Sequence, residues 1–365
     1  MTTRADDERF MARAIAVSLR HQGQTDTNPS VGCVLVKDGE IVAEAVTAIG
    51  GRPHAERQAL ELAGDAARGA TAYVTLEPCS HWGRTPPCAN ALVDFGVARV
   101  VVAVDDPDER VSGRGYEILR AAGIKVETGL MREEGRRALA GYLTRKIKSR
   151  PHVILKLAVS ADGMIGRKGE GQVAITGREA RRAVHELRAR CDAILVGIGT
   201  AIADDPELTV RIEGMERRSP VRIVLDRRLE LPLTSKLVKT AREVPVIDVT
   251  NISATGAENH IRFLAGGQLE AAGVEILEVS NLKDLLHRLA ERGMSELLVE
   301  GGASVARAFL DAGLVDRILM FESPVAVGED GVETPLRRAD IPGDYVLVGE
   351  TAFGEDRCFD FERPL

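Results

Sequence analysis

Four residues near the start of the chain carry side chains that can hold zinc and move protons. His54 and Glu56 stand two positions apart, and Cys79 and Cys88 follow with eight residues between them. Imidazole and thiolate are ligands that zinc prefers, and three protein ligands leave a fourth position open for water. Water on zinc loses a proton near neutral pH and becomes a nucleophile. We therefore predict that His54, Cys79 and Cys88 bind Zn²⁺, while Glu56 takes the proton of the water and passes it to a leaving amine.

The same residues match the zinc-deaminase signature, in which His-x-Glu precedes Pro-Cys-x-x-Cys. This chain departs from the signature because eight residues, not two, separate its two Cys residues. His81 lies within that segment and could be a fourth ligand, but a surface or substrate contact is favoured, since a catalytic site needs an open position. A closed structural zinc site and unrelated thiols are the alternatives for the three ligands. Glu56 favours catalysis over both, because a closed site has no use for an acid–base group.

Strands that alternate with helices must position these residues, and an α/β layer carries its ligands at the ends of strands. Cys79 follows a buried strand, and we expect the next helix to begin at residues 77–79, where exposed N–H groups and the helix dipole favour a thiolate. Cys33 lies in an apolar strand and is expected to be a small buried hydrophobe. We predict strands over residues 31–36, 41–46, 72–76 and 98–104, a hairpin turn at 37–40, and helices over residues 6–20, 54–63, 88–95 and 116–122.

The second half of the chain follows a basic, proline-terminated stretch, Arg145–Pro151, that fits a linker or domain boundary. Thr176 and Glu179 have the spacing of a capping box at the start of a helix. Gly301 and Gly302 join a strand to a helix, where small residues let N–H groups approach a phosphate, although a plain tight turn is the simpler alternative. They do not form G-x-G-x-x-G, so an ordinary dinucleotide-binding Rossmann unit is not indicated. Strands are predicted over residues 153–159, 193–197, 221–226, 244–250, 274–279 and 296–300, and helices up to residue 190 and over residues 281–292 and 303–312.

Length and composition restrict the class of protein. A chain of 365 residues with 44% hydrophobic residues predicts two domains, which we place at residues 1–147 and 151–365. No apolar run approaches the roughly 18 residues of a membrane span, and the polar N-terminus lacks the apolar core of a signal peptide, so we expect a cytoplasmic protein. A net charge of −7 and an aromatic content of 4% disfavour nucleic-acid binding, which needs basic grooves and stacking rings. Five Cys, an odd number, argue against a disulfide framework.

Three stretches of the first half together resemble one family, the bifunctional deaminase–reductases of riboflavin biosynthesis. They are residues 28–34 (Asn-Pro-Ser-Val-Gly-Cys-Val), 53–56 (Pro-His-Ala-Glu) and 77–88, and the Gly-Arg-Thr-Pro-Pro within the last is the family's own form of the deaminase motif. The resemblance implies an N-terminal domain similar to cytidine deaminase, with a three-layer α/β/α fold. It implies that this domain hydrolyses the ring amine of a phosphoribosylated diaminopyrimidinone, that Asn28 holds the pyrimidine and that Arg84 contacts the substrate.

Further stretches resemble the reductase domain of the same family, which is similar to dihydrofolate reductase in its α/β fold and uses NADPH. The resemblance implies reduction of the opened ribose of the deaminated intermediate to a ribityl chain. It also implies a homodimer that forms through this domain. The stretches are residues 156–163, 175–177, 185–189, 197–200, 204–211 and 299–302.

Residue roles in the second half come from the same resemblance, which implies one group at the cofactor and one at the substrate. The residues that would contact NADPH are Ala158, Thr200, Asp204 and Gly302. The residues that would contact the substrate are Arg188, Leu208, Arg211 and Glu300, of which the two Arg suit a phosphate. Lys156 and Asp204 are candidates for polar or proton-donating roles. Gln172-Val173-Ala174 departs from the Ser-x-Trp of some relatives, so nicotinamide packing can differ there.

The leading hypothesis is an enzyme for a small-molecule substrate, with zinc-dependent deamination in the first half and NADPH-dependent reduction in the second. Among enzymes, the alternative is a nucleic-acid deaminase with an accessory domain. Outside enzymes, the alternative is a structural zinc module that binds partners. Glu56 distinguishes the enzymes from the module, because only a catalytic site needs a proton carrier beside the metal.

Overall fold

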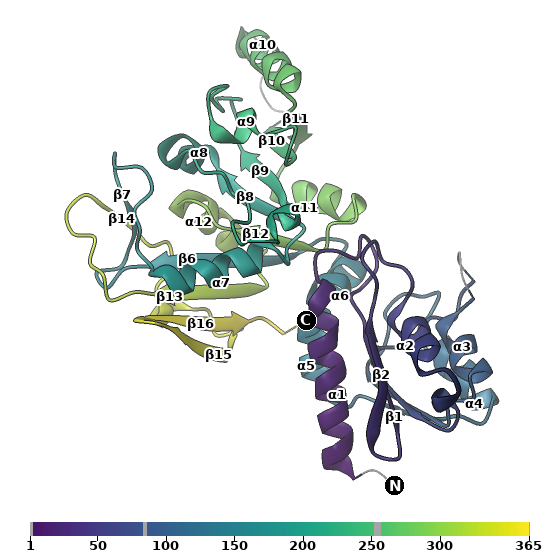
Figure 1. Cartoon of the computed structure of the whole chain (residues 1–365). Helices are drawn as coiled ribbons and strands as arrows, with labels where there is room; N and C mark the ends of the chain where they lie inside the picture. The colour runs from purple at the N-terminus through teal and green to yellow at the C-terminus, as the bar shows by residue number, and fades with distance from the viewer. Residues whose placement is uncertain (1–2, 83–85, 252–256, 365) are drawn as a thin grey trace. The chain divides into compact units, whose positions relative to one another are not determined.

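The computed structural model describes residues 3–82, 86–251 and 257–364, except for the side chains of residues 257–263 (Figure 1). The chain divides into two compact units, Met1–Ser149 and Arg150–Leu365, and each combines a central sheet with helices. The predicted α/β class with two domains is therefore confirmed. No helix within the described ranges combines the length and the apolarity that a membrane crossing needs.

A mixed sheet of five strands forms the centre of the first unit: β1 (Gly32–Lys37), β2 (Glu40–Val46), β3 (Thr71–Leu76), β4 (Arg99–Val104) and β5 (Lys125–Thr128). The strand order is β2-β1-β3-β4-β5, with β1 antiparallel to both neighbours and β3, β4 and β5 parallel. Asp38 and Gly39 close the predicted hairpin with φ of 52° and 85°, the left-handed backbone that a two-residue turn of this kind requires. β1 and β3 are buried along nearly their whole length, which explains their unbroken apolar sequences, and Cys33 is buried as predicted.

Helices cover both faces of this sheet, which gives the expected three layers (Figure 1). One face carries α1 (Arg4–Ser18) and α5 (Arg132–Ala138), and the other carries α2 (Ala55–Ala63), α3 (Cys88–Asp94) and α4 (Arg114–Ala121). α6 (Ala140–Lys148) follows α5 and closes the unit. The basic stretch near residue 145 is therefore the end of a helix, and the boundary between the units comes directly after it.

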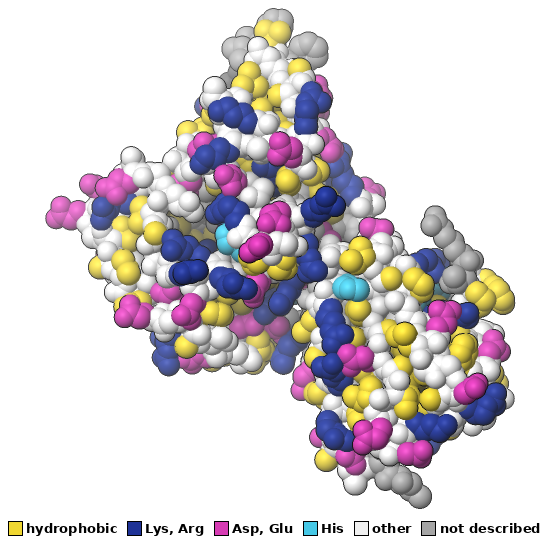
Figure 2. Space-filling view, in the orientation of Figure 1, with side chains coloured by type: hydrophobic (Ala, Val, Ile, Leu, Met, Phe, Trp, Pro, Cys, Tyr) yellow, Lys and Arg dark blue, Asp and Glu magenta, His cyan; other side chains and the backbone are white. Residues whose placement is uncertain are grey.

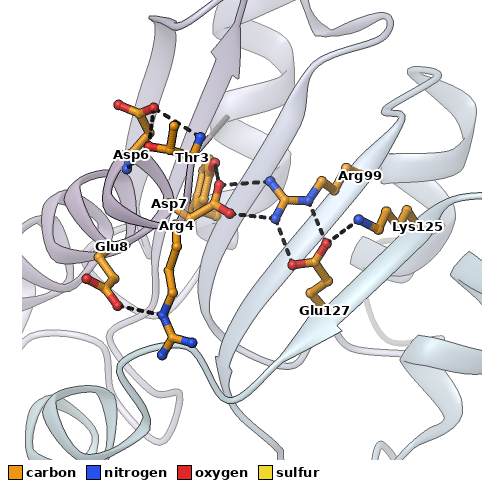
Figure 3. Close-up of polar contacts among 9 residues, drawn as sticks. Thr3, Arg4, Asp6, Asp7, Glu8, Arg99, Lys125 and Glu127 are labelled. Atoms are coloured by element: carbon orange, nitrogen blue, oxygen red, sulfur yellow. Dashed lines mark hydrogen bonds and ion pairs between the residues drawn. The ribbon is translucent and has the colours of Figure 1, made fainter. Parts of the chain in front are cut away.

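A buried ion network ties α1 to β4 and β5 (Figure 3). Arg99 donates hydrogen bonds to both carboxylate oxygens of Asp7, at 2.8 and 2.7 Å, and to both of Glu127, at 3.0 and 2.7 Å. The Tyr73 hydroxyl also donates to Asp7, at 2.5 Å. The side chains of Asp7 and Arg99 are only 12% and 14% exposed. One guanidinium thus compensates two carboxylates from different elements, and its removal leaves a buried charge without compensation.

Nine strands form the main sheet of the second unit: β6 (His152–Val159), β8 (Ala193–Gly197), β9 (Val221–Leu225), β10 (Val246–Asn251), β11 (Glu275–Val279), β12 (Glu296–Val299), β13 (Arg317–Glu322), β15 (Val346–Phe353) and β16 (Asp356–Glu362). Their order is β11-β10-β9-β8-β12-β6-β13-β16-β15. The strands from β11 to β13 are parallel, and β16 and β15 add antiparallel pairs at one edge. β7 (Met164–Arg167) and β14 (Gly331–Glu333) form a separate ribbon. The six predicted strands are present, whereas β13, β15 and β16 are not among the predicted strands.

Helices also cover both faces of the nine-stranded sheet. They are α7 (Arg178–Arg188), α8 (Ile198–Asp204), α9 (Lys236–Lys239), α10 (Ala257–Ala272), α11 (Leu282–Glu291) and α12 (Ala303–Asp311). α11 and α12 bury Leu286 and Phe309 in the core on one face, while α7 and α9 bury Val184 and Leu237 in the core on the other. Side chains of a strand alternate between its faces, so Lys156 of β6 points toward the same side as α7.

The predicted helix start at residues 77–79 is wrong. Residues 77–82 are not helical, and α3 begins only at Cys88. Pro87 stands at the N-cap of α3, and proline is tolerated at the start of a helix but not in its interior. Pro86 and Pro87 therefore prevent this helix from starting before Cys88.

The predicted capping box at Thr176 is also wrong. The N-cap residue of α7 is Gly177, and no side-chain hydrogen bond caps the helix there. The Gly177 N–H instead donates to the Asp356 carboxylate at 2.7 Å, a partner 179 positions away in the chain. A local motif cannot anticipate such a distant acceptor.

Candidate functional site

Three ligand atoms from three separate elements converge in the first unit. His54 is the N-cap of α2, Cys79 lies in the loop after β3, and Cys88 is the first residue of α3. Nδ1 of His54 lies 3.6 Å from Sγ of Cys79 and 3.4 Å from Sγ of Cys88. All three ligand atoms lie within 4.8 Å of one another. The three side chains singled out in the sequence therefore form one cluster.

This cluster has the dimensions of a zinc site. Tetrahedral zinc, with Zn–S distances of about 2.3 Å and Zn–N distances of about 2.0 Å, holds nitrogen and sulfur about 3.5 Å apart. The observed N···S distances of 3.6 and 3.4 Å lie on either side of that value. Imidazole with two thiols is also a donor set that suits zinc and not calcium or magnesium. The residues present therefore fit a three-ligand zinc ion with one position left for water.

The start of α3 polarises one of the two sulfurs. The backbone N–H of Cys88 donates to Sγ of Cys79 at 3.3 Å. Hydrogen bonds from the side chains of Cys88 and His54 lower the pKa of Cys79 to about 4, despite its burial, so this sulfur is a thiolate at neutral pH. The neighbouring Cys79 and burial raise the pKa of Cys88. A helix start thus stabilises the Cys79 thiolate, but through the residue nine positions later.

Glu56 stands beside this cluster and is not one of its three ligands. It lies in the first turn of α2 and is 4% exposed. α2 turns Glu56 inward because it shares a buried face with Leu60, one helical turn later. Burial raises the pKa of Glu56 to about 7. A carboxyl group that titrates near neutral pH can accept a proton and return it.

A pocket of about 460 Å³ adjoins the cluster and is lined by His54, Glu56 and Cys79. Its volume is typical of small-molecule sites, which span about 300–1,000 Å³. Asn28 also lines the pocket and packs on Gly51, where a Cβ would come within 2.3 Å of the Asn28 amide nitrogen. Gly51, with φ of 81°, therefore makes room for this amide at the edge of the pocket.

The segment between the two Cys is described in part. His81 lines the pocket, and its Nδ1 is buried without a hydrogen-bond partner in the described part of the chain. His81 does not belong to the group of ligand atoms that lie within 4.8 Å of one another. Arg84, the predicted substrate contact, lies outside the described residues.

Further polar residues of the pocket are missed by the sequence analysis. They come from the loop after β4 and from α6, and they are Asp106, Asp108, Arg110, Tyr142, Arg145 and Lys146. Glu77 anchors this loop, because its carboxylate accepts the backbone N–H groups of Asp106, Gly113 and Gly115 at 3.4, 3.2 and 3.2 Å. A signal was available, since residues 105–108 directly follow β4. β4 is parallel to β3 and therefore ends at the same edge of the sheet as Cys79.

Three predicted residues of the second unit form a buried ion cluster. Arg188 of α7 donates to the two carboxylate oxygens of Glu300 through Nε at 2.7 Å and Nη2 at 2.9 Å. Its Nη1 donates to the Thr209 carbonyl at 3.1 Å, and Nζ of Lys156 lies 3.9 Å from Glu300. Burial raises the pKa of Glu300, but Arg188 outweighs burial and holds it at about 2. Burial also lowers the pKa of Lys156. The cluster is therefore a set of fixed charges around an ionised Glu300.

Gly301 and Gly302 stand where the neighbouring parallel strands β8 and β12 end. A Cβ on Gly301 would lie 2.6 Å from Cβ of Val196, so the close approach of the two strand ends requires glycine. Gly302 has φ of 58° and precedes α12, and Oγ1 of Thr200 lies 3.0 Å from the place a Cβ of Gly302 would take. Two predicted cofactor contacts, Thr200 and Gly302, are thus adjacent at the start of a helix.

The loop after α8 carries two predicted substrate contacts. Leu208 is buried and has φ of 55°, a left-handed backbone that is rare for leucine. The backbone N–H of Arg211 donates to Nδ1 of His185 at 3.2 Å, and its side chain pairs with Glu207 at 3.1 Å. α7 therefore holds this loop at two points, through His185 and through the bond of Arg188 to the Thr209 carbonyl.

The other predicted residues lie near these groups without joining the ion cluster. Asp204 ends α8, and burial raises its pKa. Ala158 lies two residues beyond Lys156 on β6 and therefore faces the same side. Gln172-Val173-Ala174 has no regular secondary structure. Within the described ranges, no hydrogen bond or ion pair joins Asp204 or Ala158 to Glu300.

Two family models match this chain, one in each unit. Residues 4–104 match the cytidine and deoxycytidylate deaminase zinc-binding region. Residues 151–359, more than half of the chain, match the RibD C-terminal domain.

Individual relatives are similar over most of their length. The riboflavin biosynthesis protein RibD of Aquifex aeolicus is 42% identical over 325 residues, which cover 88% of each protein. The solved structure of Acinetobacter baumannii RibD, form 1, covers 100% of both chains at 35% identity, with a TM-score of 0.85. A Thermotoga maritima structure, described as a diaminohydroxyphosphoribosylaminopyrimidine deaminase/5-amino-6-(5-phosphoribosylamino)uracil reductase, covers 99% of both chains at 34% identity, with a TM-score of 0.85. This chain therefore belongs to the RibD family, the bifunctional enzymes of riboflavin biosynthesis that combine a zinc-binding deaminase domain with an NADPH-dependent reductase domain.

Proposed function

We propose that residues 1–147 and 151–365 perform consecutive reactions on one small molecule. The first region deaminates 2,5-diamino-6-(5-phosphoribosylamino)pyrimidin-4-one by hydrolysis. The second reduces the ribosyl chain of the product, 5-amino-6-(5-phosphoribosylamino)uracil, to ribityl with NADPH. One observation carries the proposal: a buried carboxyl group with a pKa of about 7 shares a pocket with a His–Cys–Cys cluster of zinc-site dimensions. The similarity to the Thermotoga maritima protein, which is described as a deaminase and reductase, supports it.

Glu56 is the acid–base residue of the proposed deamination, and His54, Cys79 and Cys88 are the residues that hold zinc. Zinc held by these three residues would supply an activated water for attack on the ring carbon that carries the amine. Glu56 accepts a proton from this water and delivers it to the leaving amine, which departs as ammonia. A pKa of about 7 suits both directions of transfer, since neither protonation state is strongly preferred at neutral pH.

Groups around the cluster orient the proposed substrate. The amide of Asn28 can donate to a ring carbonyl and accept from a ring N–H, which suits a pyrimidinone. Arg84 is proposed as a second contact, because its guanidinium suits a phosphate or a ring carbonyl. His81 is proposed as a substrate contact and not as a fourth ligand, because it lines the pocket outside the three-ligand group.

Bound NADPH would supply the hydride of the proposed reduction, whose acceptor is C1′ of the opened ribose in its imine or aldehyde form. The residues proposed to contact the cofactor are Ala158, Thr200, Asp204 and Gly302. The residues proposed to contact the substrate are Arg188, Leu208, Arg211 and Glu300. Arg188 has two N–H bonds left after those it donates to Glu300 and Thr209. Lys156 is the proposed proton donor, since its lowered pKa favours release of a proton.

The proposed partners are small molecules and a second copy of the chain, which forms a homodimer through the second unit. Nucleic acid is not a proposed partner, because the net charge is −7 and Figure 2 shows acidic and basic side chains interspersed on the visible surface of each unit. We place the enzyme in the cytoplasm.

A coupled assay on zinc-loaded protein tests both reactions and their order. We expect ammonia release from the diaminopyrimidinone substrate without NADPH, and oxidation of NADPH only after deamination. Ammonia without subsequent NADPH oxidation would contradict the reductase proposal and leave the deaminase proposal intact. Absence of ammonia would contradict the substrate assignment, and single-stranded oligonucleotides would then be assayed as substrates.

A further inference from the structure

Basic side chains line part of the metal pocket that the deamination roles above leave unused. Arg110 comes from the loop after β4, and Arg145 and Lys146 come from α6. A neutral aminopyrimidine ring needs no such group of cations, whereas a phosphate ester is bound by charge-assisted hydrogen bonds from arginine and lysine. We infer that Arg110 and Lys146, held in place by Asp108, bind the phosphate group of the deaminase substrate. This inference rests on the proposed function of the pocket.

Asp108 holds the two cations together. Nε and Nη2 of Arg110 donate to its two carboxylate oxygens at 2.9 and 2.7 Å, and Nζ of Lys146 donates to Oδ2 at 2.8 Å. The trio of one anion and two cations carries a net positive charge. Lys146 keeps two N–H bonds beyond the one to Asp108, and Nη1 of Arg110 has no partner within the described ranges. Both side chains can therefore bind a second anion without giving up Asp108.

Lys146 is also fixed from the side of α6. Its Nζ lies 5.8 Å from the ring centroid of Tyr142, one helical turn earlier, and the Tyr142 hydroxyl donates to Asp106 at 2.9 Å. Nη2 of Arg145 donates to the carbonyl of Thr27, the neighbour of Asn28. This face of α6 and the loop that carries Asn28 thus border the same pocket, so one ligand can reach both.

The loop of Arg110 is tied to the metal ligands. The hydroxyl of Ser80, the residue after Cys79, donates to the Arg110 carbonyl at 3.0 Å. Glu77 accepts the backbone N–H of Asp106 at 3.4 Å in the same loop. The cations are therefore held at a set position relative to the zinc ligands, as a ligand with its ring at the metal and its phosphate elsewhere requires. A pocket of about 460 Å³ has room for a nucleotide-sized ligand of this kind.

Exposed ion pairs usually contribute little, and a purely structural pairing of Asp108 with its two partners is the simplest alternative. The side chain of Asp108 is only 10% exposed, however, and all three residues line the pocket. A structural pairing predicts equal effects on every deaminase substrate. A phosphate site predicts an effect that depends on the phosphate.

The experiment compares deamination of the phosphorylated substrate with deamination of its dephosphorylated ribosylamino analogue. The variants are Lys146→Gln and Arg110→Gln, and the control is Lys148→Gln, which lies on the same helix but does not line the pocket. For each pocket variant we expect kcat/KM to fall about ten- to hundredfold for the phosphorylated substrate, the loss of one charge-assisted hydrogen bond. We expect no change for the analogue, and no change for either substrate in Lys148→Gln.

Two outcomes would overturn the inference. One is an equal loss of kcat/KM on both substrates, which indicates a structural role. The other is a phosphate preference that survives in both pocket variants and disappears only in Arg84→Gln. Calorimetric titration of the zinc-loaded full chain with inorganic phosphate gives a readout that needs no catalysis: the pocket variants should lose one binding site that Lys148→Gln keeps. If the unaltered protein releases no ammonia from either substrate, the proposed function fails, and this titration still decides the phosphate site.

Discussion

The candidate sites of the two units each contain a buried carboxyl group, and the pKa values of these two groups are shifted in opposite directions. In the first unit, Glu56 has a pKa of about 7, close to neutrality, beside a zinc-type cluster. In the second, Arg188 holds the pKa of Glu300 at about 2, so this carboxylate keeps its charge at any physiological pH. The difference fits the proposed chemistry, since deamination passes a proton through the Glu56 carboxyl, whereas reduction takes its hydride from NADPH and uses the ionised Glu300 carboxylate for orientation.

The sites also differ in how far apart their residues lie in the chain. His54 and Cys88 are 34 positions apart, and the motifs around them are short and continuous. Arg188 and Glu300 are 112 positions apart and meet only where α7 lies beside the end of β12 in the folded second unit. The first site is therefore recognisable from local sequence, and the second depends on how the strands are ordered.

The largest expected effect is that of Glu56→Gln. Loss of the proton carrier should lower kcat for deamination about 10²–10⁴-fold. Zinc content, measured by elemental analysis, should stay the same because Glu56 is not among the three ligands. Reduction of the isolated deaminated intermediate should be unaffected, since it belongs to the second unit.

The control for this variant is Glu61→Gln on the same helix, an exposed residue paired with Arg57. It should change neither activity. Deamination that survives in Glu56→Gln would show that another group carries the proton, and the contrast between the two sites would lose its basis.

Arg99→Met tests whether the two units are stabilised separately. Removal of the guanidinium leaves the buried Asp7 carboxylate without its positively charged partner, which should destabilise the first unit by about 3–5 kcal/mol. Thermal or urea unfolding should show an earlier transition for this unit only. Arg4→Met is the matched control, because Arg4 is 87% exposed in its pair with Glu8, and such a pair contributes about 0–1 kcal/mol (Figure 3). A shared loss of stability in both units would argue against separate folding.

Glu300→Gln tests whether the second site needs the fixed negative charge of Glu300. Loss of the fixed charge removes the partner of Arg188 and Lys156 and should lower kcat/KM for reduction about ten- to hundredfold. Deamination should not change. Glu291→Gln, which is exposed and lies on α11, is the control. A reductase that keeps its rate in Glu300→Gln while the second unit melts earlier would mean that Glu300 is structural only.

The smallest expected effect is the pH dependence of stability that comes from Asp248. This residue has a raised pKa but no proposed catalytic role. It is fully buried in β10, and both its oxygens lack hydrogen-bond partners within the described residues. Burial, with a contribution from Asp226, raises its pKa to about 8 from an ordinary value of 3.8. The folded state therefore favours the protonated form, and stability of the second unit should fall as pH rises between these two values.

Between about pH 6 and about pH 7.5 the expected loss is about 2 kcal/mol, from a slope of about 1.4 kcal/mol per pH unit. Urea unfolding of the second unit at the two pH values measures it. Asp248→Asn should flatten this dependence, because the amide does not titrate. An unchanged slope in Asp248→Asn would assign the dependence to another group. Deamination should be unaffected, since Asp248 belongs to the other unit.

Local patterns predicted much of the fold because burial and turn chemistry are readable in short windows. The apolar runs at β1, β3 and β6 and the Asp38–Gly39 hairpin were found for this reason. β15 was not found, because none of its residues is buried and its apolar residues do not alternate with polar ones. The capping box at Thr176 was predicted wrongly because the acceptor of the Gly177 N–H is Asp356, a residue far along the chain.

The residue types and their spacing specify the chemistry that is available to this protein. His54, Glu56, Cys79 and Cys88 are the residue types of a zinc deaminase, and their spacing places them at the ends of neighbouring elements. Which charged side chains lie together depends instead on the tertiary structure. It joined Asp108 of one loop to Lys146 of α6, and Arg188 of α7 to Glu300 at the end of β12. Ion pairs act through space over a few ångströms, so their partners are set by strand order and helix packing and leave no trace in local spacing.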